Sequence, residues 1–169
     1  MYEAGHALVA WALGHSIVAI RMLPRPAVTE TEKTFIVNNW RSFYEVLELR
    51  AMELFGGQIA EELICGGASF FSGDVPRIDE ITRILSGLEG EEKPEDIYFR
   101  LEDATYKIFA ERSCLDAIKP VAELLYERET AGQLEIPGDD IEEIIEQYIP
   151  RSEEQKKASQ GLFGFLRGN

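Results

Sequence analysis

The chain opens with the segment Met1-Tyr2-Glu3-Ala4-Gly5-His6-Ala7-Leu8-Val9-Ala10-Trp11-Ala12-Leu13-Gly14. Apolar residues recur along it with helical spacing and Gly14 supplies a stop signal, so we predict a helix over residues 2–13. Glu3 and His6 are the side chains of this mostly apolar segment that could transfer a proton or bind a metal. Taken alone, a glutamate and a histidine three residues apart favour a structural histidine over a catalytic pair.

Composition limits the classes of partner and location. The 169 residues fit one domain, and 31 acidic against 17 basic residues give a net charge of −14. That charge repels phosphate backbones and anionic lipid, so we expect no nucleic-acid partner. The longest apolar run, residues 7–13, is far short of the roughly 20 residues of a membrane span. Cys65 and Cys114 are isolated and are expected to be buried free thiols, which indicates the cytoplasm or another reducing compartment.

The remaining sequence predicts a mainly α fold with a small β element near the start. Short β-prone runs predict strands over residues 17–23 and 34–37, separated by a polar loop. Apolar spacing predicts further helices over residues 42–65, 76–85, 96–112, 115–130 and 139–148. Residues 1–150 form the predicted domain, with a linker and subdomain break near 86–95, and residues 151–169 form a C-terminal tail.

Three smaller features accompany these elements. Gly56 and Gly57 stand in the middle of a predicted helix, where each costs about 1 kcal/mol relative to alanine. Such a pair is tolerated best where another backbone approaches closely. Asp139 with Glu142 has the spacing of a helix-capping box. His15, which follows Gly14 in a turn, is expected to be solvated.

The first helix carries part of a zinc-peptidase pattern. In His-Glu-x-x-His, two imidazoles on one helical face bind the metal and the glutamate takes a proton from the metal-bound water. Glu3 and His6 match the glutamate and the second histidine, but Tyr2 stands at the first histidine position.

Longer motifs strengthen this interpretation. Residues 3–10, Glu-Ala-Gly-His-Ala-Leu-Val-Ala, resemble the active-site helix of the FtsH family of AAA-linked zinc peptidases. Residues 55–66, Phe-Gly-Gly-Gln-Ile-Ala-Glu-Glu-Leu-Ile-Cys-Gly, are similar to that family's Gly-Gly-x-x-Ala-Glu-Glu-Leu helix, and residues 124–130 to its closing Leu-Leu-x-x-Glu-Thr stretch. The resemblance covers nearly all of residues 1–149 and implies an FtsH-type peptidase-domain fold. No phosphate-binding Gly-x-x-x-x-Gly-Lys motif of an ATPase is present.

The resemblance also implies a third zinc ligand, an aspartate at the start of a helix. Aligning Ser72-Gly73 with the family's Thr-Gly places Arg77 at that ligand position, with Asp74 and Asp79 as alternative substitutes. Tyrosine titrates near pH 10 and arginine stays protonated, so neither suits zinc at neutral pH. We expect Arg77 to form an ion pair with Glu3 where the metal would lie.

These departures favour a non-catalytic member of the family, in which Glu3 is a vestigial general base, His6 is the one retained ligand and no cofactor is bound. Such a protein would be a scaffold or regulator of a protease assembly, and self-association is a second partner expectation. One alternative is an active zinc endopeptidase that uses His6, Glu3 and an aspartate. Another is a peptide-binding module in which Ile17, Val18 and Ile20 offer a strand edge to an extended chain.

Overall fold

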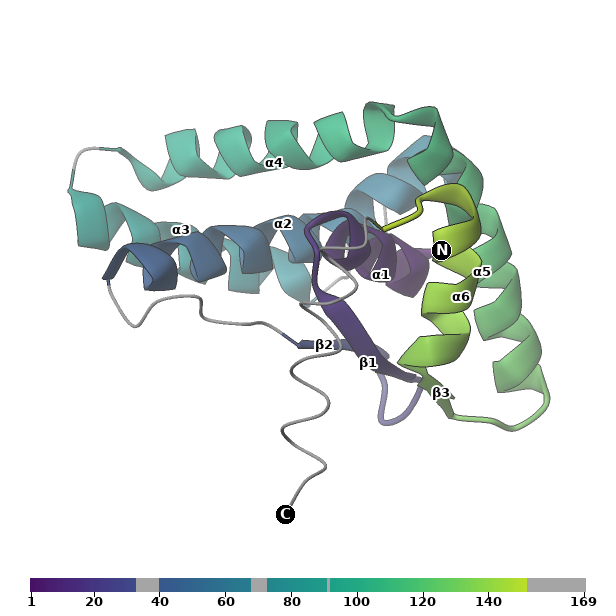
Figure 1. Cartoon of the computed structure of the whole chain (residues 1–169). Helices are drawn as coiled ribbons and strands as arrows, with labels where there is room; N and C mark the ends of the chain where they lie inside the picture. The colour runs from purple at the N-terminus through teal and green to yellow at the C-terminus, as the bar shows by residue number, and fades with distance from the viewer. Residues whose placement is uncertain (33–39, 68–72, 91, 152–169) are drawn as a thin grey trace, which may run out of the picture.

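The computed structural model describes residues 1–32, 40–67, 73–90 and 92–151, and within them the chain is mainly helical with a small antiparallel sheet (Figure 1). The fold class predicted from the sequence is thereby confirmed at this level. In chain order the elements are α1 (Tyr2–Ala12), β1 (Ser16–Arg21), β2 (Val28–Glu32), α2 (Trp40–Cys65), α3 (Asp74–Glu89), α4 (Pro94–Ala110), α5 (Arg112–Thr130), β3 (Glu135–Pro137) and α6 (Gly138–Tyr148). No helix of this described part is long and apolar enough to cross a membrane.

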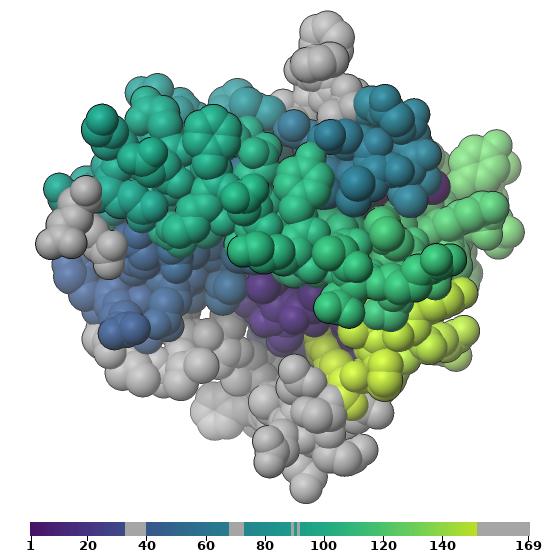
Figure 2. All heavy atoms as spheres, turned by 90° about the horizontal axis from the view of Figure 1, so that it is seen from above, coloured from purple at the N-terminus to yellow at the C-terminus, as the bar shows by residue number. Residues whose placement is uncertain are grey.

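Helix α1 is the centre of the fold. It packs against α2, α5 and both longer strands, and eight of its eleven residues are buried. Figure 2 shows α1, in purple, nearly enclosed by the helices around it. A helix that is buried on nearly all sides needs apolar residues on nearly all sides, which explains the continuous apolar run of residues 7–11.

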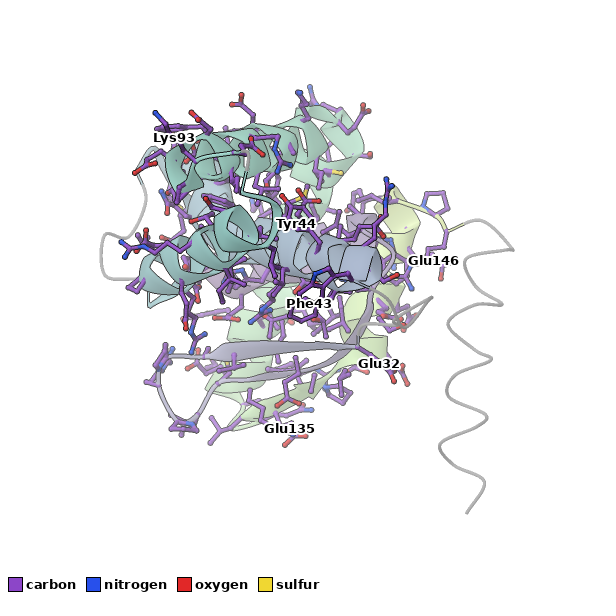
Figure 3. The ribbon with its side chains drawn as sticks, turned by 90° about the vertical axis from the view of Figure 1, so that its left-hand side faces the viewer. Glu32, Phe43, Tyr44, Lys93, Glu135 and Glu146 are labelled. Carbon is purple, nitrogen blue, oxygen red and sulfur yellow. The ribbon has the colours of Figure 1, made fainter. Side chains whose placement is uncertain are left out.

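The three strands form a sheet in the order β2-β1-β3, with both pairings antiparallel. Strand β1 lies in the middle: Ile20 is paired with Thr29 on one side and with Ile136 on the other. Ile17 and Ile20 are buried, whereas Glu135 on β3 points away from the helices (Figure 3). One face of the sheet therefore covers the helical core.

The predicted strands differ from the observed ones. The first predicted strand is confirmed over residues 17–21, but the stretch predicted as a polar loop contains β2 (residues 28–32). Strand β3 was not predicted from the sequence, and the predicted strand 34–37 and the tail beyond Arg151 lie outside the described residues. The sequence of β2 lacks alternating apolar residues because its inward-facing residues are threonines. These threonines form hydrogen bonds with glutamate side chains of α1 and α2.

The helices agree with the sequence except at their ends. The proposed linker 86–95 is mostly helical, since α3 continues to Glu89 and α4 begins at Pro94. The prediction of a capping box at the start of α6 is wrong, because no side chain caps this helix. The Glu142 carboxylate instead accepts a hydrogen bond from the backbone N–H of Ile17 at 2.7 Å. Of the two cysteines, Cys114 is buried as predicted but Cys65 is exposed.

Glycines allow α1 and α2 to touch at the level of their backbones. A Cβ atom added to Gly56 would lie 2.7 Å from the carbonyl oxygen of Gly5, and one added to Gly5 would lie 2.6 Å from the Cβ of Ala60. Real Cβ atoms essentially never approach other atoms that closely. The close approach predicted from the mid-helix glycine pair is confirmed, and its partner is the helix that carries His6.

This contact generates a stability prediction. Gly5→Ala should destabilise the protein by about 1–3 kcal/mol, because overpacking outweighs the better helix propensity of alanine. Urea unfolding followed by circular dichroism measures the change. Gly87→Ala in α3 is the matched control: no atom lies within 4 Å of its added Cβ, so it should be neutral or stabilising by up to about 1 kcal/mol. Equal midpoints for Gly5→Ala and the unsubstituted protein would contradict the close packing of α1 on α2.

Candidate functional site

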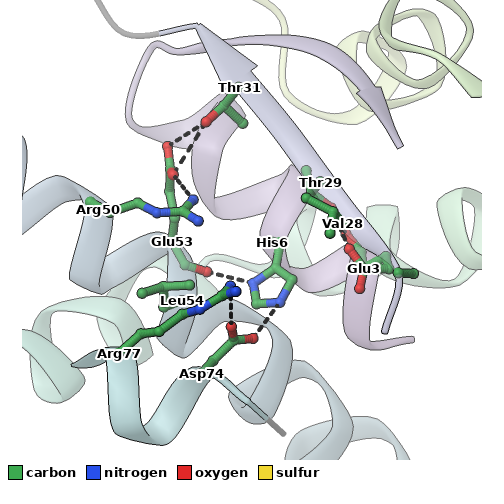
Figure 4. Close-up of a pocket in the computed structure, with 11 residues that line it drawn as sticks. Glu3, His6, Val28, Thr29, Thr31, Arg50, Glu53, Leu54, Asp74 and Arg77 are labelled. Carbon is green, nitrogen blue, oxygen red and sulfur yellow. Dashed lines mark hydrogen bonds and ion pairs between the residues drawn. The ribbon is translucent and has the colours of Figure 1, made fainter. Parts of the chain in front are cut away.

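The candidate site lies where α1, α2 and the start of α3 meet beneath β2 (Figure 4). Tyr2 and His6 are four residues apart on α1 and therefore share one face of the helix. Asp74 is the first residue of α3. Gly57 of α2 makes room for the two rings, because a Cβ there would lie 2.7 Å from the His6 imidazole and 2.8 Å from the Tyr2 ring.

Both nitrogens of the His6 imidazole have partners. Nδ1 donates to the backbone carbonyl oxygen of Glu53 at 2.7 Å, and Nε2 lies 3.2 Å from the Oδ2 atom of Asp74. The side chains of His6 and Asp74 are only 10% and 13% exposed. The carbonyl contact fixes the proton on Nδ1 and leaves Nε2 as the nitrogen that faces the carboxylate.

The Asp74 carboxylate joins three side chains. Its Oδ2 accepts a hydrogen bond from the Tyr2 hydroxyl at 2.6 Å in addition to the His6 contact, and its Oδ1 lies 3.4 Å from a guanidinium nitrogen of Arg77. We call Tyr2, His6 and Asp74 the Tyr-His-Asp cluster. Asp74 is thus the hub of this cluster, and its charge is neutralised from two directions.

The environment shifts the pKa values of both ionisable partners. Burial disfavours the charged imidazole, but the hydrogen bond to Asp74, the charges of Glu3 and Asp74 and the Glu53 carbonyl outweigh it, so the pKa of His6 is raised. Burial also disfavours the Asp74 carboxylate, yet its hydrogen bonds to His6 and Tyr2 lower its pKa overall. The two shifts together favour an imidazolium–carboxylate pair.

The structure places the other sequence-derived candidates differently from the expectation. The partner found for Arg77 is Asp74, not Glu3, and its side chain is 58% exposed. Glu3 instead accepts a hydrogen bond from the Thr29 hydroxyl of β2 at 2.6 Å. Asp79 lies one turn further along α3 and pairs with Arg83 on an exposed face. Of the two aspartates considered as ligands, only Asp74 faces His6.

A second polar network lies beside the first. The Glu53 carboxylate is almost fully buried, with a residue exposure of 1%, and His15 Nδ1 lies 2.5 Å from it. Arg50 at 2.9 Å and Thr31 at 3.3 Å also bind this carboxylate (Figure 4). A buried carboxylate without such partners would cost several kcal/mol. Because the backbone of Glu53 binds His6 while its side chain binds His15, one residue connects both histidines.

Sequence reasoning missed this second network. His15 was expected to be solvated, but its side chain is only 11% exposed and bonds to a glutamate 38 residues away. Glu53 gave a weak signal: a glutamate between apolar residues in a predicted helix faces the core and needs partners there. The sequence offered no means of identifying those partners.

The cluster does not fit a zinc ion. Zinc sites in proteins use three or four nitrogen, sulfur or carboxylate donors. Across residues 1–32, 40–67, 73–90 and 92–151, no group of three or more His, Cys, Asp or Glu side chains is arranged to hold a metal. His6 and Asp74 supply two such donors, and the third neighbour is the phenol of Tyr2, which is not among the usual zinc ligands.

Two cavities meet at the cluster. A small pocket of about 30 Å³ is lined by Glu3, His6 and Asp74 among others, and it has room for one or two water molecules. A larger cleft of about 420 Å³ opens beside it, and its lining residues include Tyr2, Glu3, Asp74 and Tyr126. Glu3, Asp74 and Arg77 line both cavities, so the cluster lies where the small pocket and the larger cleft adjoin.

The strand that was expected to offer a free edge to a peptide is not an edge strand. Ile17, Val18 and Ile20 lie on β1, which is the central strand and not an edge. Ile20 is paired on both sides, and the backbone N–H of Ile17 donates to Glu142 of α6. The short β3 strand, which was not predicted from the sequence, pairs with residues 19–21 and so covers part of the edge that was proposed for an extended peptide.

Comparison with known proteins adds no family assignment: neither protein-family models nor curated proteins give a match to this chain.

The coupled pair generates a pH prediction. The raised pKa of His6 contributes stability that is present below pH 6.5 and is lost as the pH rises through the folded-state pKa. The lowered pKa of Asp74 contributes stability that is present above pH 3.8 and is lost in more acid solution. Asp74→Asn should therefore cost about 1.5–3 kcal/mol between roughly pH 4 and 6.5, and less at higher pH.

Urea unfolding at several pH values measures this difference. Asp79→Asn is the matched control on the same helix, because its exposed pair with Arg83 should contribute less than about 1 kcal/mol. A loss for Asp74→Asn that is the same at pH 5 and pH 9 would show that the ion pair with His6 does not form.

Proposed function

We propose that this chain is a non-catalytic, FtsH-type peptidase-like domain that acts as a scaffold or regulatory partner of a protease assembly. The observation that carries the proposal is the occupation of His6 Nε2 by Asp74, with the Tyr2 hydroxyl on the same carboxylate oxygen. The side chains at the positions where a peptidase would bind zinc contact one another through a hydrogen bond and an ion pair instead. The motif resemblance of residues 3–10 and 55–66 supplies the link to the peptidase family.

The general-base position supports the same conclusion. In a zinc peptidase the glutamate acts on a metal-bound water. Here Glu3 accepts a hydrogen bond from Thr29, and the neighbouring helix position carries a phenol in place of the first imidazole. In this proposal Glu3 does not activate a water molecule. Its negative charge acts on His6, and its hydrogen bond with Thr29 connects α1 to β2.

The cleft beside the cluster suits a binding role without cleavage. It has a volume of about 420 Å³, and its wall combines Met22, Leu125 and Tyr126 with charged side chains. Arg25 and Glu129 at its rim are joined by an ion pair. A partner protein that inserts an apolar side chain would find both surface to bury and polar groups at the rim.

An active zinc endopeptidase is the competing proposal, and one distance favours it. Asp74 lies close enough to His6 that both could act as ligands if an ion displaced the proton between them. The chemistry still lacks a third donor suited to zinc. The choice between the proposals is therefore a question of metal content.

Metal analysis and a casein-type cleavage assay test the proposal. The purified chain should contain far less than one equivalent of zinc and should not cleave casein, and His6→Ala should change neither result. Tyr2→His restores a second imidazole on the His6 face of α1 and should raise zinc affinity, because imidazoles four residues apart share a helical face. Tyr126→His in the same cleft is the control and should not raise it. Stoichiometric zinc in the unsubstituted protein that is lost with His6→Ala would overturn the proposal.

A further inference from the structure

The cleft of about 420 Å³ beside the Tyr-His-Asp cluster combines apolar surface with charged side chains. Its apolar lining includes Met22, Leu125 and the ring of Tyr126, and its volume is in the range of pockets that bind small ligands. Met22 and Leu125 are almost fully buried, whereas Tyr126 is 71% exposed. The cleft therefore offers apolar surface that a long side chain can cover, together with one exposed aromatic ring.

The charged side chains of the cleft are mostly carboxylates. Four carboxylates stand against two guanidiniums, which leaves two net negative charges among the lining side chains. They belong to Glu3, Glu61, Asp74 and Glu129, and to Arg25 and Arg77. The net charge of −14 on the whole chain adds a field of the same sign. The cleft therefore attracts a cationic group and repels a carboxylate.

The two guanidiniums of the cleft are already bound to carboxylates. Arg25 pairs with Glu129, and Arg77 pairs with Asp74 at 3.4 Å. Both arginine side chains are more than half exposed, so water screens these pairs and they contribute little to stability. Glu3 accepts a hydrogen bond from a neutral hydroxyl, that of Thr29. An incoming cation can therefore add to the cleft or exchange with Arg25 at a small cost.

The chemistry of helix α5 selects the kind of cation. Tyr126 and Glu129 are three residues apart on α5 and therefore share one face of the helix. A guanidinium stacks on an aromatic ring and binds a carboxylate through two parallel hydrogen bonds, whereas the ammonium group of lysine has no flat face and no fork of donors. The aliphatic stem of arginine also covers apolar surface. An exposed tyrosine beside a carboxylate therefore favours arginine over lysine.

From this arrangement we infer that the cleft binds an arginine side chain that a partner protein presents next to apolar residues. The aliphatic stem lies against Met22 and Leu125. The guanidinium stacks on Tyr126 and pairs with Glu129 in exchange with Arg25. The inference rests on the proposed function, because it names the group by which a non-catalytic scaffold or regulator recognises its partner.

Peptide titrations followed by ¹⁵N–¹H NMR of the full chain test the inference. The probe is the acetylated peptide Gly-Ser-Leu-Arg-Leu-Ser-Gly, which should shift the amide signals of residues 122–129 in a saturable way. Replacing its arginine by citrulline keeps the shape but removes the charge. This change should weaken binding by at least about tenfold, because the charged hydrogen bonds and the contact with the ring are lost together. A glutamate in the same place should abolish binding.

Two variants locate the binding site. Tyr126→Leu keeps an apolar side chain in the cleft but removes the aromatic face, so it should weaken binding of the arginine peptide by at least about threefold. Phe99→Leu is the matched control, since Phe99 is an exposed aromatic residue of α4 that does not line this cleft. It should leave the dissociation constant unchanged.

Three outcomes overturn the inference. Equal binding of the arginine and citrulline peptides would show an apolar site without charge recognition, and equal binding by Tyr126→Leu would place the peptide elsewhere. Cleft signals that shift when the protein is diluted without peptide would make a second copy of the chain the occupant. Mass spectra of the same samples report peptide cleavage. Cleavage would overturn the non-catalytic function, whereas an intact but unbound peptide would overturn this inference alone.

Discussion

The contact between α1 and α2 determines where every other part of the site lies. Gly5 and Gly56 bring the two helix backbones together, and Gly57 admits the rings of Tyr2 and His6 to the surface of α2. Any side chain at these glycines would push the helices apart and remove His6 from the Glu53 carbonyl. The cost of three glycines in helix interiors, about 1 kcal/mol each, is offset by this packing and by the polar contacts that depend on it.

Each of the two histidines is paired with a carboxylate in the interior of the molecule. His6 is bound to Asp74, and His15 is bound to Glu53, while Glu53 joins the two pairs through its own backbone. Since an unpaired buried charge costs several kcal/mol, each network holds the elements that supply it at fixed distances. The first pair ties α1 to α3, and the second ties the α1–β1 turn to α2.

The sequence predicted the parts of this arrangement that arise from local patterns. The apolar run of α1, the helical spacing of α2 and the close approach at Gly56 all follow from neighbouring residues. Asp74 was considered as a substitute ligand but Arg77 was preferred, because the alignment of Ser72-Gly73 with the family motif placed Arg77 at the ligand position. In the structure, Asp74 is the first residue of α3 and contacts His6.

The remaining errors have a common physical cause. β3 is only three residues long, and the inward residues of β2 are threonines, so neither strand has an alternating apolar signal. His15 was misplaced because its partner, Glu53, is distant in the sequence. Each of these features depends on contacts between segments that are far apart in the chain. Such contacts leave no periodic pattern of apolar residues in the local sequence.

The central claim is that Asp74 holds His6 Nε2 so that zinc does not bind there. Long-range proton–nitrogen NMR of the His6 ring tests it most directly, since the chain has only two histidines and His6→Gln assigns the signals. The account predicts that both ring nitrogens carry protons at pH 6 and that one equivalent of zinc leaves the His6 signals unchanged. An Nε2 atom without a proton at pH 6, with a signal that shifts stoichiometrically on addition of zinc, would contradict it.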